Sequence, residues 1–494
     1  MECFRKQLTI AFSLLSLLAL PGVYRAAAQS KPERIDSLMN ENFSNGVLNG
    51  IVLVAENGKV IYEKAFGYAD MEWNVPNEIR TKSNLASVTK QFVAMLVLQQ
   101  VEKGTMKLDA NITDYLPDYP EATGKKITIH HLLNHTSGIP NYTDLPEFDQ
   151  VFSRSSYPTP ESFVSAFADS ALQFEPGSKY SYNNSAYFLL GVILEKVTGT
   201  PFAQLLQKNI LDPLGMKETG MDDQVALVPR RASGYNRGML ANTHAGYWDR
   251  SSLYTAGGMY STVGDLLLWE QALYTEKLLP GKYGDLFFAR SIAIDSVTGY
   301  GYGWFLKRVG LNGGRDSIDV TYHTGTITGF NALIYRVPAT RRTFICLNNM
   351  LVGRDYLIAM ARGCMNILYD RPIDHPKKSI AVRVGVELVS GGISQALKAF
   401  EQLRGRPDLY NLNEEEFNTL GYEVLRQRTA SEAVEIFKLN VASFPGSSNV
   451  YDSLGDAYAK EGNTSLAMEN YRKAVEVDSS NLASAEKLRK LRSK

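Results

Sequence analysis

The chain has 494 residues, more than one hydrophobic core usually supports, so we expect two or three domains. Hydrophobic residues make up 44% of the sequence and charged residues 21%, which is the balance of an ordinary globular protein. The 52 Lys and Arg residues equal the 52 Asp and Glu residues in number, so the net charge does not indicate a nucleic acid or an acidic membrane surface as partner.

The N-terminus has the pattern of a signal peptide, which we predict over residues 1–28. Arg5 and Lys6 precede an apolar run at residues 8–20, and the small residues at 26–28 offer a cleavage site. The apolar run is shorter than the ~20 residues that a membrane-spanning helix needs. We therefore expect an exported protein, periplasmic or secreted, with no membrane span after the signal is removed.

The first elements of the mature chain are a helix and a β-hairpin. Residues 33–46 have a helical pattern, and two strand-like runs follow at 51–55 and 60–66. The dipeptide Asn57-Gly58 between the two runs is a strong hairpin signal.

The segment Ser87-Val88-Thr89-Lys90 begins an apolar helix that ends near Gly104. A serine and a lysine three residues apart share one helix face, about 5–6 Å between Cβ atoms. The apolar run at 92–98 predicts that this helix is buried, and a buried lysine is costly unless it is paired or neutral. This spacing alone occurs by chance in many proteins, so its weight depends on the rest of the chain.

The stretch from 104 to about 290 is predicted to be mostly helical, with a second buried helix at 187–194. A helix at 356–369 closes the domain. Strand-like runs return at 302–306, 318–322, 331–335 and 342–347. Early and late strands around a helical insertion predict one helix-covered sheet with a separate helical lobe, and a cleft between them.

The C-terminal part has the pattern of a helical repeat, at residues 386–494 after a linker at 371–385. Four residues recur 34 positions later: Leu420, Gly421, Ala433 and Phe437 return as Leu454, Gly455, Ala467 and Tyr471. This period and spacing resemble the tetratricopeptide repeat. About three repeats are usually needed for stability, so we expect this module to lean on the preceding domain or on a partner.

Two further motifs accompany Ser87 and Lys90: Tyr182-Asn183-Asn184 before the second buried helix, and His323-Thr324-Gly325 between strand-like runs. With these motifs the chain resembles the penicillin-recognising serine hydrolases, which include class C β-lactamases, D-alanyl-D-alanine carboxypeptidases, D-aminopeptidases and related esterases. The resemblance implies an α/β domain at residues 30–370, with a β-lactamase/transpeptidase-like antiparallel sheet flanked by helices and a helical lobe. It also implies serine acyl transfer with no metal or cofactor.

The catalytic residues predicted from these motifs are Ser87, Lys90 and Tyr182. A serine hydroxyl is a weak nucleophile and needs a base beside it. Burial would lower the pKa of Lys90, and a nearby Tyr182 would lose its proton more easily than a free phenol. Either group would serve as the base, and Tyr182 is the better placed to return the proton to a leaving group. The amide of Asn184 would orient Lys90 and bind a substrate carbonyl.

The third motif supplies the predicted substrate-binding residues His323, Thr324, Gly325 and Thr326. The family resemblance implies that the backbone N–H groups of Ser87 and Thr326 form an oxyanion hole. His323 departs from β-lactamases and most penicillin-binding carboxypeptidases, which carry lysine there. Histidine is largely neutral at pH 7, so it gives a substrate carboxylate less attraction than lysine does.

Other candidate groups have simpler interpretations. His131 and His135 are four residues apart, but no third metal ligand stands at a useful spacing, so we predict that they pack beneath the cleft and that there is no metal site. We favour buried free thiols over a disulfide for Cys346 and Cys364.

A glycine pair and three aromatic residues are further candidates for the surroundings of the cleft. We expect Gly257-Gly258 to let the backbone pass close to the active-site wall. Tyr300, Tyr302 and Trp304 fit the cleft lining and the core equally well.

The sequence therefore predicts an exported serine hydrolase that cleaves an ester or amide through a Ser87 acyl-enzyme. The alternative within the same class is a β-lactamase or D,D-carboxypeptidase. An alternative of another class is a ligand sensor or scaffold that binds proteins through the repeats. Expected partners are a small-molecule or peptide substrate and a protein bound by the repeats, but no nucleic acid.

Overall fold

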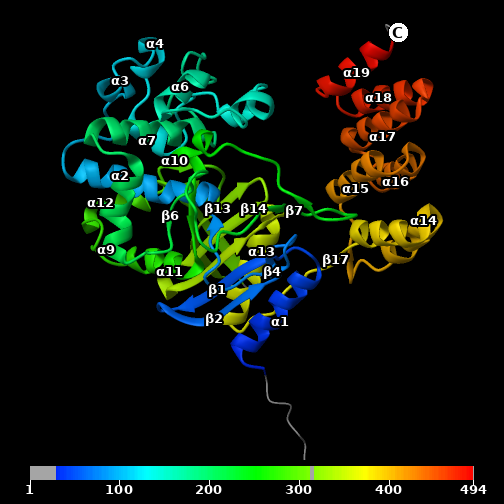
Figure 1. Cartoon of the computed structure of the whole chain (residues 1–494), viewed down its shortest axis with the longest axis horizontal. Coiled ribbons are helices and arrows are strands. Elements are labelled where there is room, and N and C mark those ends of the chain that lie inside the picture. The colour runs from blue at the N-terminus through cyan, green and yellow to red at the C-terminus, as the bar shows by residue number, and fades with distance from the viewer. Residues whose placement is uncertain (1–28, 312–315, 493–494) are drawn as a thin grey trace, which may run out of the picture.

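The computed structural model describes residues 29–311 and 316–492, and the predicted signal peptide at 1–28 lies outside this part. An α/β domain and a helical module stand side by side (Figure 1). The α/β domain is built on an eight-stranded antiparallel sheet of order β10-β11-β12-β13-β14-β15-β1-β2. The strands are β1 Gly50–Glu56, β2 Lys59–Phe66, β10 Ile292–Ala293, β11 Thr298–Tyr300, β12 Phe305–Leu311, β13 Asp316–Ile327, β14 Phe330–Val337 and β15 Arg342–Asn348.

The sheet joins both ends of the domain, as the sequence predicts. β1 pairs with β2 on one side and with the late strand β15 on the other. Asn57 and Gly58 both have positive φ, 53° and 74°, as the predicted hairpin turn requires. The predicted strand at 302–306 is corrected: Tyr302 and Trp304 are buried in a turn, and β12 begins at Phe305.

Helices cover both faces of the sheet. Alternate side chains of β1 point to opposite faces. Val52 and Val54 pack with α1 Lys31–Ser44 and α13 Arg354–Leu368. Ile51 and Leu53 pack on the other face, in the core that contains α2 Thr89–Glu102 and α11 Val263–Ala272.

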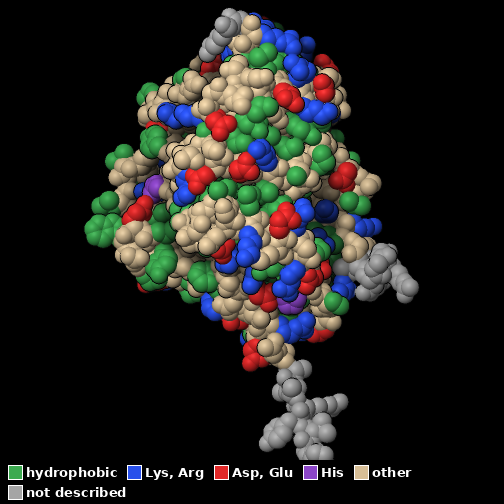
Figure 2. Space-filling model, turned by 90° about the vertical axis from the view of Figure 1, so that its right-hand side faces the viewer, with side chains coloured by type: hydrophobic (Ala, Val, Ile, Leu, Met, Phe, Trp, Pro, Cys, Tyr) green, Lys and Arg blue, Asp and Glu red, His purple; other side chains and the backbone are tan. Residues whose placement is uncertain are grey.

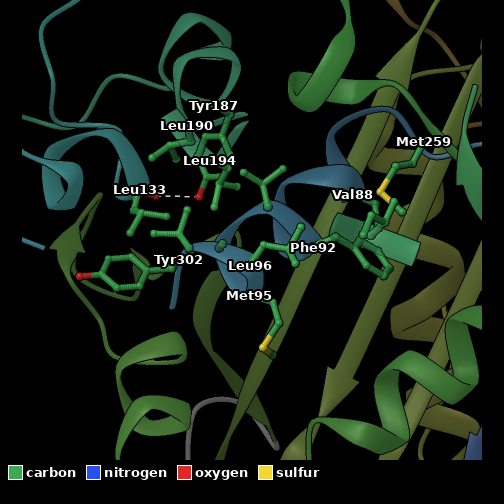
Figure 3. Packing of buried hydrophobic residues seen from close by; sticks show 14 of the residues in the cluster. Val88, Phe92, Met95, Leu96, Leu133, Tyr187, Leu190, Leu194, Met259 and Tyr302 are labelled. Atoms are coloured by element: carbon green, nitrogen blue, oxygen red, sulfur yellow. Dashed lines mark hydrogen bonds between the residues drawn. The ribbon is translucent and has the colours of Figure 1, made fainter. Parts of the chain in front are cut away.

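Helix α2 lies between the sheet and the helical lobe, and it is buried from Thr89 to Gln100. Figure 3 shows its side chains beside those of α7 Asn184–Thr198, the second buried helix of the sequence analysis. The hydroxyl of Tyr187 donates to the carbonyl of Leu133 at 2.8 Å, which ties α7 to α5 Ile129–Leu133. Packing against the sheet on one side and against the helical lobe on the other thus holds α2 in position.

The remaining elements of the α/β domain are short. The helices are α3 Ile112–Tyr115, α4 Glu121–Gly124, α6 Pro160–Ala168, α8 Phe202–Leu206, α9 Asp212–Leu214, α10 Tyr254–Gly257 and α12 Gly281–Phe287. The strands outside the main sheet are β3 Tyr68–Asp70, β4 Val75–Pro76, β5 Ser83–Asn84, β6 Gly220–Met221, β7 Tyr235–Asn236, β8 Thr243–His244, β9 Met259–Ser261 and β16 Met350–Leu351.

The C-terminal module is all helical, which is compatible with the predicted repeat. A side chain at Gly421 or Gly455 would meet the ring of Phe437 or Tyr471 at 2.4 or 2.6 Å, so the repeated glycines let paired helices approach. The helices are α14 Ile380–Arg404, α15 Glu414–Gln427, α16 Ala430–Ser443, α17 Ser448–Glu461, α18 Thr464–Val477 and α19 Leu482–Arg492. On the face in Figure 2, basic and acidic side chains are interspersed, consistent with the balanced composition.

Helix α14 begins at Ile380, inside the segment predicted as a linker at 371–385. The pair β17 Lys378–Ser379 and β18 Tyr410–Asn411 precedes and follows α14, and Ser379 caps that helix by accepting from the N–H of Val382. Helix α14, which is kinked at Gly392, is long and apolar enough by length and composition alone to span a membrane, in contrast to the expectation of no span after the signal peptide. Val384 and Leu388 of this helix are buried in the core of the module.

Candidate active site

Ser87 lies in a tight 3₁₀ turn, Ala86–Val88, that leads into α2. Ala86 has φ of +45°, a left-handed conformation that is uncommon and strained for a residue with a side chain. Its N–H donates to Oδ1 of Asn84 at 2.7 Å, which holds the turn in place. Ala86 and Val88 are buried while Ser87 is partly exposed, so the turn presents the serine.

Lys90 is buried beside this serine. Its Nζ lies 3.1 Å from Oγ of Ser87, 2.9 Å from Oδ1 of Asn184 and 2.6 Å from the carbonyl oxygen of Ala256. Burial holds the pKa of Lys90 well below its usual value, as the sequence analysis expected. The predicted passage of Gly257 near the site also agrees, because its Cβ position is 3.3 Å from the backbone of Ala86.

The predicted motif Tyr182-Asn183-Asn184 meets Ser87 and Lys90 at the start of α7. Asn183 caps this helix by accepting from the N–H of Ala186 at 2.8 Å. The Nζ of Lys90 lies 5.0 Å from the centre of the Tyr182 ring. The chain thus brings together the two helix starts that carry the predicted nucleophile and bases.

The expectation that Tyr182 loses its proton easily is corrected. Burial raises the pKa of Tyr182 well above its usual value, and the nearby side chain of Ser87 only partly offsets this effect. Tyr182 is therefore a neutral phenol at neutral pH, whereas Lys90 is the group whose proton is easily lost.

The third motif, His323-Thr324-Gly325, lies inside strand β13 rather than between strands. The last pairing of β13 with β12 is at Tyr322, and the strand continues beyond it along the Ser87 turn. A Cβ at Gly325 would lie 2.0 Å from the carbonyl oxygen of Leu85, so only glycine allows this approach. Thr326, the predicted backbone donor, follows directly and is exposed.

The side chain of His323 differs from the expected cleft-lining group, because only 1% of the residue is exposed. Its Nδ1 donates to the carbonyl of Thr324 at 2.7 Å, and its Nε2 accepts from the hydroxyl of Tyr300 at 3.0 Å. Burial and the nearby Lys90 lower the pKa of His323 to about 3. The ring is neutral, and neither nitrogen is free for a substrate carboxylate.

His135 packs beneath the site, as predicted, and it also holds the second motif. Its Nδ1 accepts the N–H of Asn183 at 3.1 Å, and its ring centre lies 4.4 Å from that of Tyr182. Burial keeps the pKa of His135 well below its usual value. No spacing signal in the sequence indicates this support. In the described part of the chain, no cluster of three or more metal-ligating side chains occurs.

The remaining candidate residues lie either beside the site or in the core. Tyr300 touches the site through His323, whereas the hydroxyl of Tyr302 bonds to His130 at 2.7 Å and Trp304 lies in the core. Cys346 and Cys364 are buried free thiols, as favoured.

Comparisons with known proteins identify the family and the fold of this chain. The sequence model described as Beta-lactamase matches residues 33–361. The chain is 28% identical over 368 residues to penicillin-binding protein 4* of Bacillus subtilis. This alignment covers 71% of this chain and 79% of that protein. Two solved structures are similar with TM-scores of 0.58: a penicillin binding protein from Bacillus halodurans, 26% identical over 66% of this chain and 98% of the other, and the D-amino acid amidase of Ochrobactrum anthropi, 25% identical over 68% and 98%.

Proposed function

The chain belongs to the Beta-lactamase family and is a serine hydrolase, and from this premise we propose that it cleaves an ester or amide through an acyl-enzyme on Ser87. The observation that carries the proposal is the 3.1 Å separation between Nζ of Lys90 and Oγ of Ser87. When Lys90 is neutral, its two N–H groups donate to Oδ1 of Asn184 and to the carbonyl oxygen of Ala256. Its lone pair then faces the hydroxyl of Ser87.

The reaction then has two halves. Lys90 takes the proton of Ser87 as Oγ attacks the substrate carbonyl, and the backbone N–H groups of Ser87 and Thr326 stabilise the oxyanion. The bond to the leaving group breaks, and the leaving group takes a proton from Tyr182, which Lys90 restores. Water next attacks the acyl carbon and gives a proton to Lys90, and Lys90 passes this proton to Oγ of Ser87 as the bond between Oγ and the acyl carbon breaks. The raised pKa of Tyr182 supports its role as a proton donor rather than the first base.

The substrate we favour is an ester or a small amide. His323 is neutral and its nitrogens are engaged, so it offers no positive charge to a carboxylate. The similarity to a D-amino acid amidase supports an amide of this kind. Thr324, Gly325 and Asn184 would line the site beside the scissile carbonyl.

A β-lactamase or D,D-carboxypeptidase is the second candidate, favoured by the relatives named as penicillin-binding proteins. Hydrolysis of a chromogenic cephalosporin, a D-Ala-D-Ala peptide and short aryl esters would rank the candidates. A clear preference for the cephalosporin would contradict the weight given to His323.

A third candidate is a sensor or scaffold that binds a protein through the repeats. Deleting residues 380–494 would leave hydrolysis unchanged and remove a cellular partner if this candidate is right. For location, we propose export to the periplasm or medium, supported by the signal-like pattern at residues 1–28.

The decisive test is covalent labelling of the serine. A fluorophosphonate or a penicillin should add one adduct to the wild-type protein, detected by intact mass, and none to Ser87→Ala. No adduct on the wild type, or equal adducts on both proteins, would overturn the proposal.

A further inference from the structure

The helical module holds the tip of a hairpin that belongs to the α/β domain. Strands β7 and β8 form this hairpin, and its tip, residues 237–242, reaches across to the module (Figure 1). Met239 at the tip is 6% exposed and lies in the apolar core of the module, in the same cluster as Phe417 and Leu420 of α15. The carboxylate of Glu423, also on α15, accepts the backbone N–H groups of Met239 at 3.0 Å and Leu240 at 2.8 Å.

A buried ion pair also holds the hairpin tip against α15. Nη1 of Arg237 lies 2.7 Å from Oε1 of Glu416 on α15, and the side chains are only 8% and 9% exposed. The hydroxyl of Tyr356 donates to the same oxygen of Glu416 at 2.8 Å. Breaking a buried pair leaves an uncompensated charge, so the tip is held firmly against α15.

The base of the hairpin lies against the turn that follows Thr326. Gly329 occupies this turn between β13 and β14, with φ of +78°. A Cβ at Gly329 would lie 2.5 Å from Cβ of Ala245 and 2.7 Å from the backbone of Gly234, so the hairpin base and the turn are in direct contact. Continuous packing thus joins α15 of the module to the end of β13 beside the site.

A cavity of about 620 Å³ lies at this junction. Its lining includes residues of the hairpin base, of the strand before Ser87, of the turn after β13 and of the start of β14, namely Asn84, Gly234, His244, Ala245, Thr328 and Phe330. Asn84 is the residue that holds the N–H of Ala86, so the cavity adjoins the turn of the nucleophile. Among the described residues the Nδ2 of Asn84 is buried and has no hydrogen-bond partner.

We propose that Glu423 is a positioning residue of the hydrolase, which fixes the hairpin and thereby one wall of a pocket for a bulky substrate group beside Ser87. This inference rests on the proposed function of Ser87. The helical module then contributes to substrate selection without contacting the substrate. Loss of Glu423 frees the N–H groups of Met239 and Leu240 and loosens the wall, but leaves Ser87 and Lys90 in place.

The test compares two uncharged esters with one leaving group, p-nitrophenyl acetate and p-nitrophenyl phenylacetate, on the full-length protein. Glu423→Ala should raise KM for the phenylacetate by about fivefold or more, the lower end of usual coupling between two sites. The KM for the acetate and kcat for both esters should stay near the wild-type values. Equal changes for both esters, or no change, would overturn the inference.

Controls separate positioning from loss of the fold. Glu435→Ala removes a carboxylate of α16 that bonds to Lys438, and it should behave as the wild type. Glu423→Gln keeps one oxygen as acceptor and should give an intermediate KM. Hydrogen exchange should accelerate at residues 243–246 in Glu423→Ala and stay unchanged in α17 and α18. If the wild type cleaves neither ester, the proposed function fails, and unchanged exchange at 243–246 would independently overturn this inference.

Discussion

Nζ of Lys90 lies 3.1 Å from Oγ of Ser87, in an enclosure where its two other partners are uncharged carbonyl oxygens. Within the described residues, none of its hydrogen-bond partners is a carboxylate, so burial is not compensated by a negative charge. The same environment that makes a charged amine costly makes a neutral amine available as a base.

Removing this amine should slow acylation strongly. Lys90→Met should reduce the rate of fluorophosphonate labelling about 10²–10⁴-fold, the usual contribution of a general base. Lys90→Arg should be equally slow, because a guanidinium stays protonated. Stopped-flow or gel-based labelling kinetics would measure both variants, and near-normal labelling of either would exclude Lys90 as the base.

The pH dependence of labelling should identify the base. The neutral form of Lys90 is the active one, so the rate falls as pH falls through its lowered pKa. Tyr182→Phe should slow release of a poor leaving group, because the proton donor is gone. It should not change the pH range in which the labelling rate falls on acidification, the acid limb of the profile. Loss or displacement of the limb in Tyr182→Phe would instead assign the first proton transfer to Tyr182.

The sequence predicts the parts of this site that depend on local spacing. Ser87 and Lys90 share a face because helical periodicity puts them there, and the early and late strands join because both are apolar enough to be buried. The carbonyl of Ala256 was not predictable, because it reaches Lys90 from a distant segment. The burial of His323 and the insertion of Met239 into the module also depend on packing that no local pattern records.

Gly325 should be intolerant of a side chain. Gly325→Ala would place Cβ 2.0 Å from the carbonyl oxygen of Leu85 and push β13 away from the Ser87 turn. We expect a loss of about 1–3 kcal/mol in unfolding free energy and about 10²-fold in acylation rate. Gly264→Ala in α11 is the matched control, because its Cβ meets no atom within 4 Å. Thermal unfolding and labelling rates measure both, and equal behaviour of the two variants would refute the steric argument.

Acid should destabilise the domain partly through His323. Its pKa is about 3 in the folded chain and near 6.5 when unfolded, so between these values the unfolded chain binds the additional proton. Stability is therefore lost as pH falls below 6.5, by about 1.4 kcal/mol per pH unit from this group. His323→Gln lacks this loss, so the stability difference between wild type and variant should shrink from pH 7 to 4.5. Urea denaturation would measure the unfolding free energy of both proteins at each pH. An equal difference between wild type and variant at pH 7 and pH 4.5 would contradict this prediction.

Among the ionic contacts of the α/β domain, we expect the buried pair of Arg336 and Glu270 to affect the unfolding free energy most when it is broken. Nε of Arg336 lies 3.0 Å from Oε1 of Glu270, and the side chains are 2% and 0% exposed. Glu270→Gln leaves the guanidinium without its counter-charge, so we expect a loss of about 3–5 kcal/mol in unfolding free energy. The double variant Arg336→Met with Glu270→Leu removes both charges and should recover most of this loss. If the double variant were as unstable as the single one, packing rather than the unpaired charge would explain the effect.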